Sequence, residues 1–308
     1  MPQDQHCLPQ DIQLLERGWL SSNNILFLTP TDGTVVDTGY ASHALQTGDL
    51  ICSALDGRTL TKIINTHLHS DHCGGNAHLQ SLWPDVKTLI PPGQIQAVQA
   101  WDTLALSYEP TGQRCPAFRF DQALQAGLKV DAGQRQLTVY AAPGHDPHAV
   151  LLFEPELRLL LSADALWENG FGVVFPELEG ESGFDEVKET LDLIESLQAQ
   201  MVIPGHGPAF GDVNGALQRA RSRLAKFQAE PTFHARYAAK VLLKFRLLET
   251  QKETLDNLKQ WTERTPYFKL LHERFFNTTS PASWFTELVE ELSRAKALTV
   301  NGDTVFNT

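Results

Sequence analysis

The sequence lacks any run of about 18 apolar residues, which is the length that a helix needs to span a bilayer. It also lacks a signal-peptide pattern, because Met1–His6 has no basic region followed by an apolar stretch. Its four cysteines, Cys7, Cys52, Cys73 and Cys115, form no Cys-x-x-Cys pair, so we expect reduced thiols. Together these absences predict a cytoplasmic protein with no membrane partner.

Positive charge is scarce as well. The chain has 25 Lys and Arg residues against 37 Asp and Glu residues, a formal net charge of −12. Such a chain repels polyphosphate at long range, which argues against a general nucleic-acid binder. The Gly-x-Ser-x-Gly motif, the phosphate loop and the Gly-x-Gly-x-x-Gly fingerprint are all absent. These absences remove three classes of site and leave a small-molecule substrate as the expectation.

The length of 308 residues allows one large domain and one small one. The first two hundred residues alternate β-type runs with helical patterns, which predicts an α/β domain. Strands are expected at 25–28, 34–37, 62–65, 88–90, 136–141, 150–153, 158–162 and 201–203. Apolar residues at helical spacing predict helices over 94–108 and 184–197.

The character of the sequence changes after Gly215, where residues 216–297 contain almost no β-type run. Pro231 and Pro266 interrupt what are expected to be several helices, and Asn301-Gly302 predicts a terminal hairpin. We therefore expect a catalytic domain over 1–212 and a mainly helical, winged-helix-like domain over 213–308. Given the acidic chain, we expect this second domain to close a pocket or to dimerise, and a homodimer is left open.

Ligand-type side chains are concentrated after the strand at 62–65. His67, His69, Asp71 and His72 occupy four of six positions, and Gly74-Gly75 supplies permissive backbone just beyond them. One histidine alone would be read as an ordinary core or surface residue. Three histidines and one aspartate so close together are hard to explain by packing. Imidazole and carboxylate are the ligands that suit zinc, iron or manganese.

Three more ligand-type residues follow later strands in the same manner. His145 comes after the strand at 136–141, Asp164 after 158–162, and His206 after 201–203, each flanked by small or turn residues. Loops at strand ends place functional groups on a rigid scaffold. The sequence therefore predicts a two-metal site of seven residues in a metal-dependent hydrolase.

This pattern resembles the metallo-β-lactamase-fold hydrolases, in particular the branch with glyoxalase II, acyl-homoserine-lactone lactonases and lactamase-β-2-like proteins. The ligand pattern covers residues 62–207, and the core resemblance covers about 20–210. The resemblance implies an αββα sandwich with the metals at one edge. It also implies that His67, His69 and His145 hold the first metal, that Asp71, His72 and His206 hold the second, and that Asp164 bridges both.

The sequence departs from the family pattern at two places. Asp146-Pro147-His148 follows His145 where relatives often have Thr-Pro-Gly, and Ala163 stands where they often have glycine. Neither departure removes a ligand. Asp146 and His148 are either second-layer partners of the ligands or ordinary loop polarity. Cys73 is expected to be a small buried residue rather than a ligand.

The expected cofactors are two divalent transition-metal ions, zinc first and iron or manganese as alternatives. Two such ions share and activate a water, which attacks a polarised carbonyl, and one of them stabilises the developing oxyanion. Asp71 is the candidate catalytic residue, because its carboxylate can orient the water or accept its proton. The expected substrate is a thioester, a lactone or another small ester.

The substrate pocket is expected in two aromatic-rich segments, 91–133 and 166–175. The candidate lining residues are Trp167, Phe171, Tyr108 and Arg114, although most aromatics in these segments are expected to be core. No match is found to the basic residues with which glyoxalase II grips glutathione.

Two other functions remain open at this point. A mononuclear iron redox enzyme resembling persulfide dioxygenases keeps the same His-x-His-x-Asp-His motif. A nucleic-acid-processing protein, suggested only by the winged-helix-like tail, ranks last. In flavodiiron-type relatives the second histidine of the motif is usually glutamate, so His69 argues against that group.

Overall fold

The computed structural model describes residues 8–308, so the expectations for Met1–His6 and Cys7 lie outside the described residues. The chain divides into two compact units. The first comprises the chain up to Leu106 together with Arg114–Leu224, and the second comprises Ser107–Gln113 with Ala225–Thr308. The domain boundary between 212 and 213 stays a prediction. Within residues 8–308, no helix combines the length and the apolar character needed to cross a membrane.

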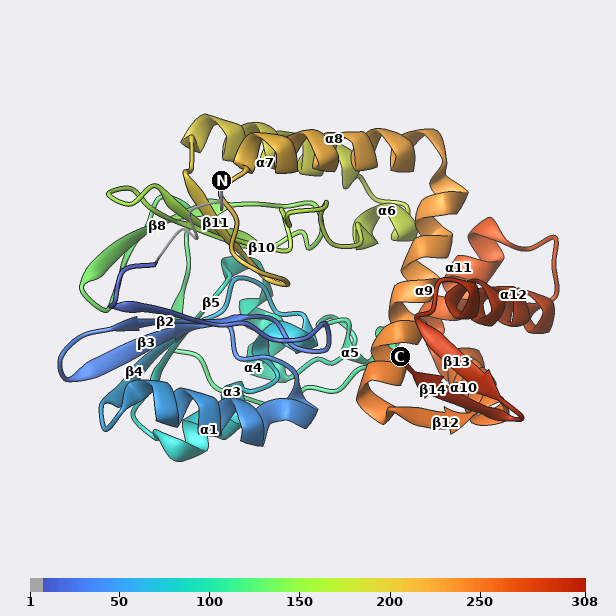
Figure 1. The fold of residues 1–308 in the computed structure, drawn as a ribbon, viewed down its shortest axis with the longest axis horizontal. Helices are drawn as coiled ribbons and strands as arrows, with labels where there is room; N and C mark the ends of the chain where they lie inside the picture. The colour runs from blue at the N-terminus through green and yellow to red at the C-terminus, as the bar shows by residue number, and fades with distance from the viewer. Residues whose placement is uncertain (1–7) are drawn as a thin grey trace, which may run out of the picture. The chain divides into compact units, whose positions relative to one another are not determined.

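The first unit is built on two β-sheets that lie face to face (Figure 1). The first sheet contains, in spatial order, β1 (Ile12–Leu15), β2 (Asn24–Leu28), β3 (Asp32–Val36), β4 (Thr59–Ile64), β5 (Lys87–Ile90) and β6 (Gln122–Ala123). The second contains, also in spatial order, β11 (Met201–Pro204), β10 (Leu159–Ala163), β9 (Val150–Glu154), β8 (Arg135–Ala141) and β7 (Lys129–Ala132). Strands β2 and β3 pair antiparallel and form a hairpin.

Helices cover the outer faces of both sheets, with α1 and α3 beside the first sheet and α7 beside the second (Figure 1). The helical elements of this unit are η1 (Ala41–His43), α1 (Ala44–Leu55), α2 (Ser70–Cys73), α3 (Asn76–Leu82), η2 (Pro92–Gln94), α4 (Ile95–Ala100), α6 (Phe175–Glu179), α7 (Phe184–Leu197) and most of α8 (Val213–Ala229). The predicted α/β fold class and the helical C-terminal region are confirmed.

The main core lies between the two sheets. Phe27 and Ile64 of the first sheet share one buried apolar cluster with Leu152, Leu161 and Ile203 of the second. A separate cluster on the outer face of the first sheet joins its other side chains to α1 and α3. Because side chains alternate between the two faces of a strand, both clusters arise from the same strands. This packing makes the strand ends a rigid platform for the loops that follow them.

The predicted continuous helix over 94–108 is wrong. Helix α4 ends at Ala100, and Trp101 adopts a left-handed backbone conformation with φ +51°. The side chain of Asp102 then accepts hydrogen bonds from the backbone amides of Leu104 and Ala105, at 3.0 and 3.1 Å. An aspartate that binds nearby amides stabilises a turn against the helix. The apolar spacing beyond residue 100 therefore does not continue as a helix.

The second unit is mainly helical and carries a small antiparallel sheet. Its elements are α5 (Tyr108–Thr111), α9 (Pro231–Thr250), β12 (Lys252–Thr254), α10 (Leu255–Arg264), α11 (Pro266–Phe275), α12 (Pro281–Arg294), β13 (Leu298–Asn301) and β14 (Thr304–Asn307). Strands β13 and β14 form the hairpin predicted at Asn301-Gly302. Pro231 and Pro266 each open a helix, the position where a missing amide hydrogen costs nothing. The winged-helix-like character stays a prediction.

Candidate metal centre

All seven predicted ligands lie just beyond the ends of strands in the first unit. His67 and His69 follow β4, and the short helix α2 then carries Asp71 and His72. The other three follow strands of the second sheet, namely His145 after β8, Asp164 after β10 and His206 after β11. The two sheets therefore deliver four and three of these side chains to one edge of the sandwich.

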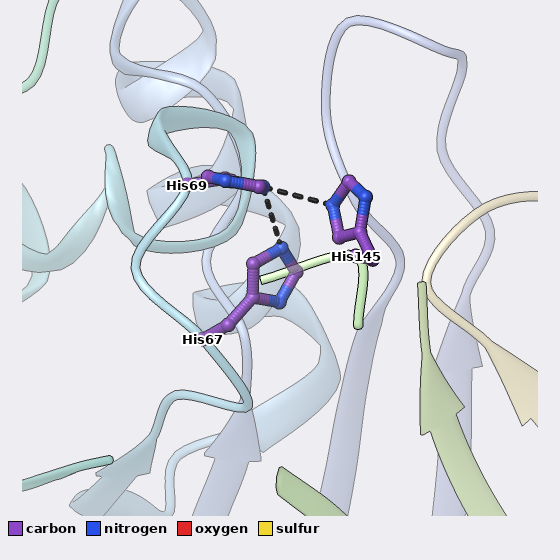
Figure 2. Close-up of side chains that lie close together, drawn as sticks. All are labelled: His67, His69 and His145. Carbon is purple, nitrogen blue, oxygen red and sulfur yellow. Dashed lines mark hydrogen bonds between the residues drawn. The ribbon is translucent and has the colours of Figure 1, made fainter. Parts of the chain in front are cut away.

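Three of the histidines turn their ring nitrogens toward one another, as Figure 2 shows. Nδ1 of His69 lies 3.1 Å from Nε2 of His67 and 2.9 Å from Nε2 of His145. A neutral imidazole has only one N–H, so His69 cannot donate to both neighbours. Three converging nitrogens that cannot all be satisfied by one another are suited to a common cation. This set fits a divalent metal ion.

The carboxylate of Asp164 lies among the remaining ligands. Its Oδ1 is 3.4 Å from Nε2 of His72 and 3.8 Å from Nε2 of His206, and its Oδ2 is 3.5 Å from Nε2 of His145. Asp71 Oδ2 in turn lies 3.2 Å from Nε2 of His206. The donor atoms fall into three overlapping groups, each within 4.8 Å: His67, His69 and His145; His67, His72 and Asp164; Asp71, His72 and His206.

Hydrogen bonds on the far side of two rings fix which nitrogen carries the proton. Nδ1 of His72 donates to Oδ2 of Asp37 at 2.8 Å, and Nδ1 of His145 donates to the carbonyl of Val173 at 2.5 Å. When either ring is neutral, as a metal ligand must be, the lone pair on its Nε2 points into the site. Nε2 of His72 is buried and has no hydrogen-bond partner. A buried ring nitrogen without a hydrogen-bond partner is costly, and a metal ion bound to the neutral ring would occupy this position, which supports a metal site.

Asp37 is the residue of this network that the sequence analysis missed. Its carboxylate accepts the backbone N–H of Thr66 at 2.9 Å and the Thr66 hydroxyl at 2.7 Å, besides the ring of His72. Because that hydroxyl donates to Asp37, its oxygen accepts from Nδ1 of His67 at 3.2 Å. Asp37 follows β3, the strand beside β4, and this position was the signal available in the sequence.

Burial and neighbouring carboxylates together set the charge of four of the histidines. Burial, which penalises the charged ring, lowers the pKa of His69 to about 4 and that of His145 also to about 4. Burial likewise holds the pKa of His67 well below its ordinary value. Burial also acts to lower the pKa of His72, but the carboxylates of Asp164 and Asp37 outweigh it and raise that pKa well above the ordinary value. Three of the rings are thus neutral at neutral pH, which is the form that binds metal.

Two glycines make room for the ligands. A Cβ atom on Gly205 would lie 2.3 Å from Oδ1 of Asp164, and one on Gly172 would lie 2.3 Å from Nδ1 of His145. Such contacts are far inside van der Waals distance, so any larger residue would displace a ligand. Ala163, where relatives often have glycine, has φ +47°, in the left-handed region that favours glycine.

The four predicted pocket residues differ in their surroundings. Trp167 is beside the ligands, because its Nε1 donates to Oδ1 of Asp164 at 3.2 Å. Phe171 is completely buried, and its carbonyl accepts from Arg223 at 3.0 Å. Arg114 is exposed, and its backbone N–H donates to the hydroxyl of Tyr40. Tyr108 belongs to the second unit and is 2% exposed. Their pocket roles stay predictions.

Trp19 and Phe175 lie near the ligands and add to the sequence analysis, and Asp146, already a candidate second-layer partner, lies there too. Trp19 stacks on His206 with ring centroids 5.3 Å apart, and Phe175 meets the ring of His69 edge-on at 5.4 Å. Oδ2 of Asp146 is 3.7 Å from Nε2 of His69, at the outer limit of an ion pair. Trp19 is remote in sequence from every ligand, so local motifs could not reveal it.

Cys73, which directly follows the ligand His72, is buried, as predicted. Its Sγ lies 3.8 Å from Sγ of Cys115 and 3.4 Å from the carbonyl oxygen of His69. No disulfide joins the two sulfurs. Cys73 belongs to none of the three groups of converging donor atoms, so it stays outside the ligand set.

Comparison with known proteins gives the class of this chain. A profile of the Metallo-beta-lactamase superfamily matches residues 17–206, more than half of the chain. The chain belongs to this superfamily. The fold is also that of a metallo-beta-lactamase family protein from Thermus thermophilus, with a TM-score of 0.60 at 19% identity over 98% of this chain and all of that one.

Two curated relatives of the chain carry the names of particular enzymes. The chain is 26% identical to the acyl-coenzyme A thioesterase MBLAC2 of Gallus gallus over 48% of this chain and 57% of that protein. It is 26% identical to the hydroxyacylglutathione hydrolase of Rhodospirillum rubrum over 60% of this chain and 62% of that protein. The chain thus matches less than two thirds of the length of either relative.

Proposed function

We propose that this protein hydrolyses thioesters with two divalent transition-metal ions. The observation that carries the proposal is the central carboxylate of Asp164, which lies within 4 Å of histidines from both sets of ligands. The proposed first set is His67, His69 and His145, and the second is Asp71, His72 and His206. Asp164, which converges with His67 of the first set and His72 of the second, is assigned to both.

When bound, such ions polarise a carbonyl group and lower the pKa of water toward neutrality. The side chain of Asp71 is the proposed partner of the water. Hydrogen bonding from His206 and its charge, together with the charge of His72, outweigh burial and lower the pKa of Asp71, so this carboxylate is ionised at neutral pH. As a hydrogen-bond acceptor, this carboxylate would orient the attacking water. His69 and Asp71 are the most exposed of the seven side chains, at 16% and 13%, so substrate enters on their side.

The choice of thioesters rests on the two curated relatives. Acyl-coenzyme A and hydroxyacylglutathione, named in the descriptions of those proteins, are both thioesters. A carbonyl bonded to sulfur is an electrophile that an activated water can attack without a seryl or cysteinyl nucleophile. The absence of a Gly-x-Ser-x-Gly motif in this chain is consistent with that route.

Metal content is the first test. Purified protein should hold about two transition-metal ions per chain, zinc before iron or manganese. His67→Ala and Asp164→Asn should each lower this number. His78→Ala, on the neighbouring helix α3 and outside the site, is the matched control and should not. Fewer than one ion per wild-type chain, or an unchanged content in His67→Ala, overturns the two-metal proposal.

Substrate turnover is the second test. Acyl-coenzyme A, an S-acylglutathione, a homoserine lactone, a β-lactam and a phosphodiester are compared at equal, measured metal content. The proposal expects thiol release from the thioesters, lost in Asp164→Asn and retained in His78→Ala. Turnover of the lactone or β-lactam alone overturns the thioester choice. Oxygen uptake with glutathione persulfide by the iron-loaded protein, without thioester cleavage, would instead identify an iron redox enzyme.

A further inference from the structure

An exposed tryptophan lies directly on the candidate metal centre. Trp19, in the loop between β1 and β2, is 56% exposed. One face of its indole stacks on the ring of His206, with centroids 5.3 Å apart and planes inclined by 11°. Its ring also meets Trp167 edge-to-face at 5.2 Å and 70°. One indole face is therefore covered by a ligand, while much of the side chain is left to solvent.

Trp167 is held in place by the same ligands. Its Nε1 donates to Oδ1 of Asp164 at 3.2 Å, and its backbone N–H donates to the carbonyl of Gly170 at 2.7 Å. Its ring meets His206 edge-on at 5.7 Å. The two indoles thus form one aromatic surface that is attached to Asp164 and His206.

The loop that carries Trp19 is fixed to the site by its backbone. The amide of Ser22 donates to the carbonyl of Asp71 at 2.9 Å, and the amide of Asn23 donates to the carbonyl of Gly205 at 2.7 Å. The side chain of Asn23 adds a bond to the carbonyl of Pro204 at 3.0 Å. These bonds tie the loop to both ligand-bearing segments around Asp71 and His206. The position of Trp19 over the site is therefore a property of the fold.

Arg17, the basic residue of this loop, donates its hydrogen bonds to residues outside the metal centre. The guanidinium of Arg17 donates to the side chains of Asn24, Thr47 and Gln46, at 2.8, 2.9 and 3.0 Å. Its donors are thus directed to neutral groups of the protein. What this loop offers to a substrate is aromatic surface, which attracts apolar groups rather than the anionic groups of a thiol such as coenzyme A.

We propose that the indoles of Trp19 and Trp167 bind the apolar acyl group of the substrate and so determine acyl preference. The inference rests on the proposed thioester hydrolysis. Both rings lie within 6 Å of His206, a ligand. Groups bonded directly to the reacting carbonyl are the ones that reach this surface. An acyl chain of several carbons covers the indoles and is favoured over a short one, because each buried methylene adds binding free energy.

The test separates acyl preference from a role in holding the metal. Wild type, Trp19→Ala and Trp19→Phe are assayed with acetyl-, butyryl- and octanoyl-coenzyme A, and their metal content is measured. In Trp19→Ala the ratio of kcat/KM for octanoyl to that for acetyl should fall about tenfold or more, mainly through KM. Trp19→Phe should recover most of the ratio, and both variants should keep the wild-type metal content. Leu82→Ala, an exposed apolar residue of α3, is the matched control.

A second series keeps the octanoyl group and replaces coenzyme A by glutathione or N-acetylcysteamine. The proposal expects Trp19→Ala to lower kcat/KM by a similar factor with every thiol. The proposal is overturned if the fall in kcat/KM of Trp19→Ala depends on which thiol the substrate carries. It is also overturned if the octanoyl-to-acetyl ratio is unchanged in Trp19→Ala or if this variant loses metal. Failure of wild type to cleave any thioester would instead reject the proposed function, so the two failures are distinguishable.

Discussion

The buried carboxylate of Asp37 lies 2.8 Å from Nδ1 of His72 and keeps the proton on that nitrogen. Asp37→Asn should weaken metal binding by about 10–100-fold, because the amide cannot accept from His72 and from Thr66 as the carboxylate does. Titration of the metal against a competing chelator measures the effect. Asp32→Asn, at the start of the same strand, is the control. Equal affinity in Asp37→Asn and wild type would refute the positioning role of Asp37.

Gly205 is expected to tolerate no side chain. Gly205→Ala places a methyl group 2.3 Å from Oδ1 of Asp164 and 2.8 Å from Cε1 of His72, so at least one ligand must move. The variant should lose most of its bound metal and its activity. In Gly18→Ala the new methyl group meets nothing within 4 Å, and metal content should be unchanged. Elemental analysis of both purified variants decides, and a fully loaded Gly205→Ala contradicts the geometry.

Ala163 tests the backbone before the central aspartate. Its φ of +47° is unfavourable for any residue with a Cβ atom and most unfavourable for a β-branched one. Ala163→Val should therefore destabilise the fold by about 1–3 kcal/mol. Ala141→Val, at the exposed end of strand β8, should have little effect. Chemical denaturation gives both free energies of unfolding, and equal values would show that the backbone at 163 is not strained.

The lowered pKa of His69 gives a pH dependence with a defined sign. The folded state keeps this ring neutral down to about pH 4, whereas the unfolded chain takes up a proton near its ordinary value of 6.5. Metal-free protein should therefore lose stability through this group as the pH falls from 6.5 to 4. In the His69→Gln variant, the glutamine side chain takes up no proton between pH 6.5 and 4.

The free energy of unfolding of chelator-treated wild type should accordingly fall relative to that of His69→Gln over this interval. Above pH 6.5 the difference between the two proteins should be constant. Denaturant titrations at several pH values measure it, and a difference that is flat down to pH 4 would contradict the lowered pKa.

The strands and the order of their ligands were predictable because both are local. An apolar run such as 201–203 followed by Pro204-Gly205-His206 carries its strand, its turn and its ligand within six residues. The fold class follows from the alternation of such units, and the structure agrees with it. The assignment of each residue to a particular ion depends on the resemblance and stays a proposal.

What sequence reasoning missed depends on contacts between distant residues. Trp19 and His206 meet only because the loop after β1 is bonded to the loop after β11. Asp37 reaches His72 because β3 and β4 are neighbours in a parallel pair. The helix expected over 94–108 fails for a local reason, because Asp102 offers its carboxylate to the following amides. The spacing of apolar residues in the sequence reports neither contacts between distant residues nor side-chain hydrogen bonds that end a helix.

The ligands come from both layers of the sandwich, four after a strand of one sheet and three after strands of the other. A metal ion bound by both groups of ligands would link the two sheets. Metal binding and folding would then be one coupled equilibrium. Free metal at about a thousand times its dissociation constant would add about 4 kcal/mol to the stability of the fold. The amount of intact protein in a cell would then follow the supply of metal, independently of any substrate.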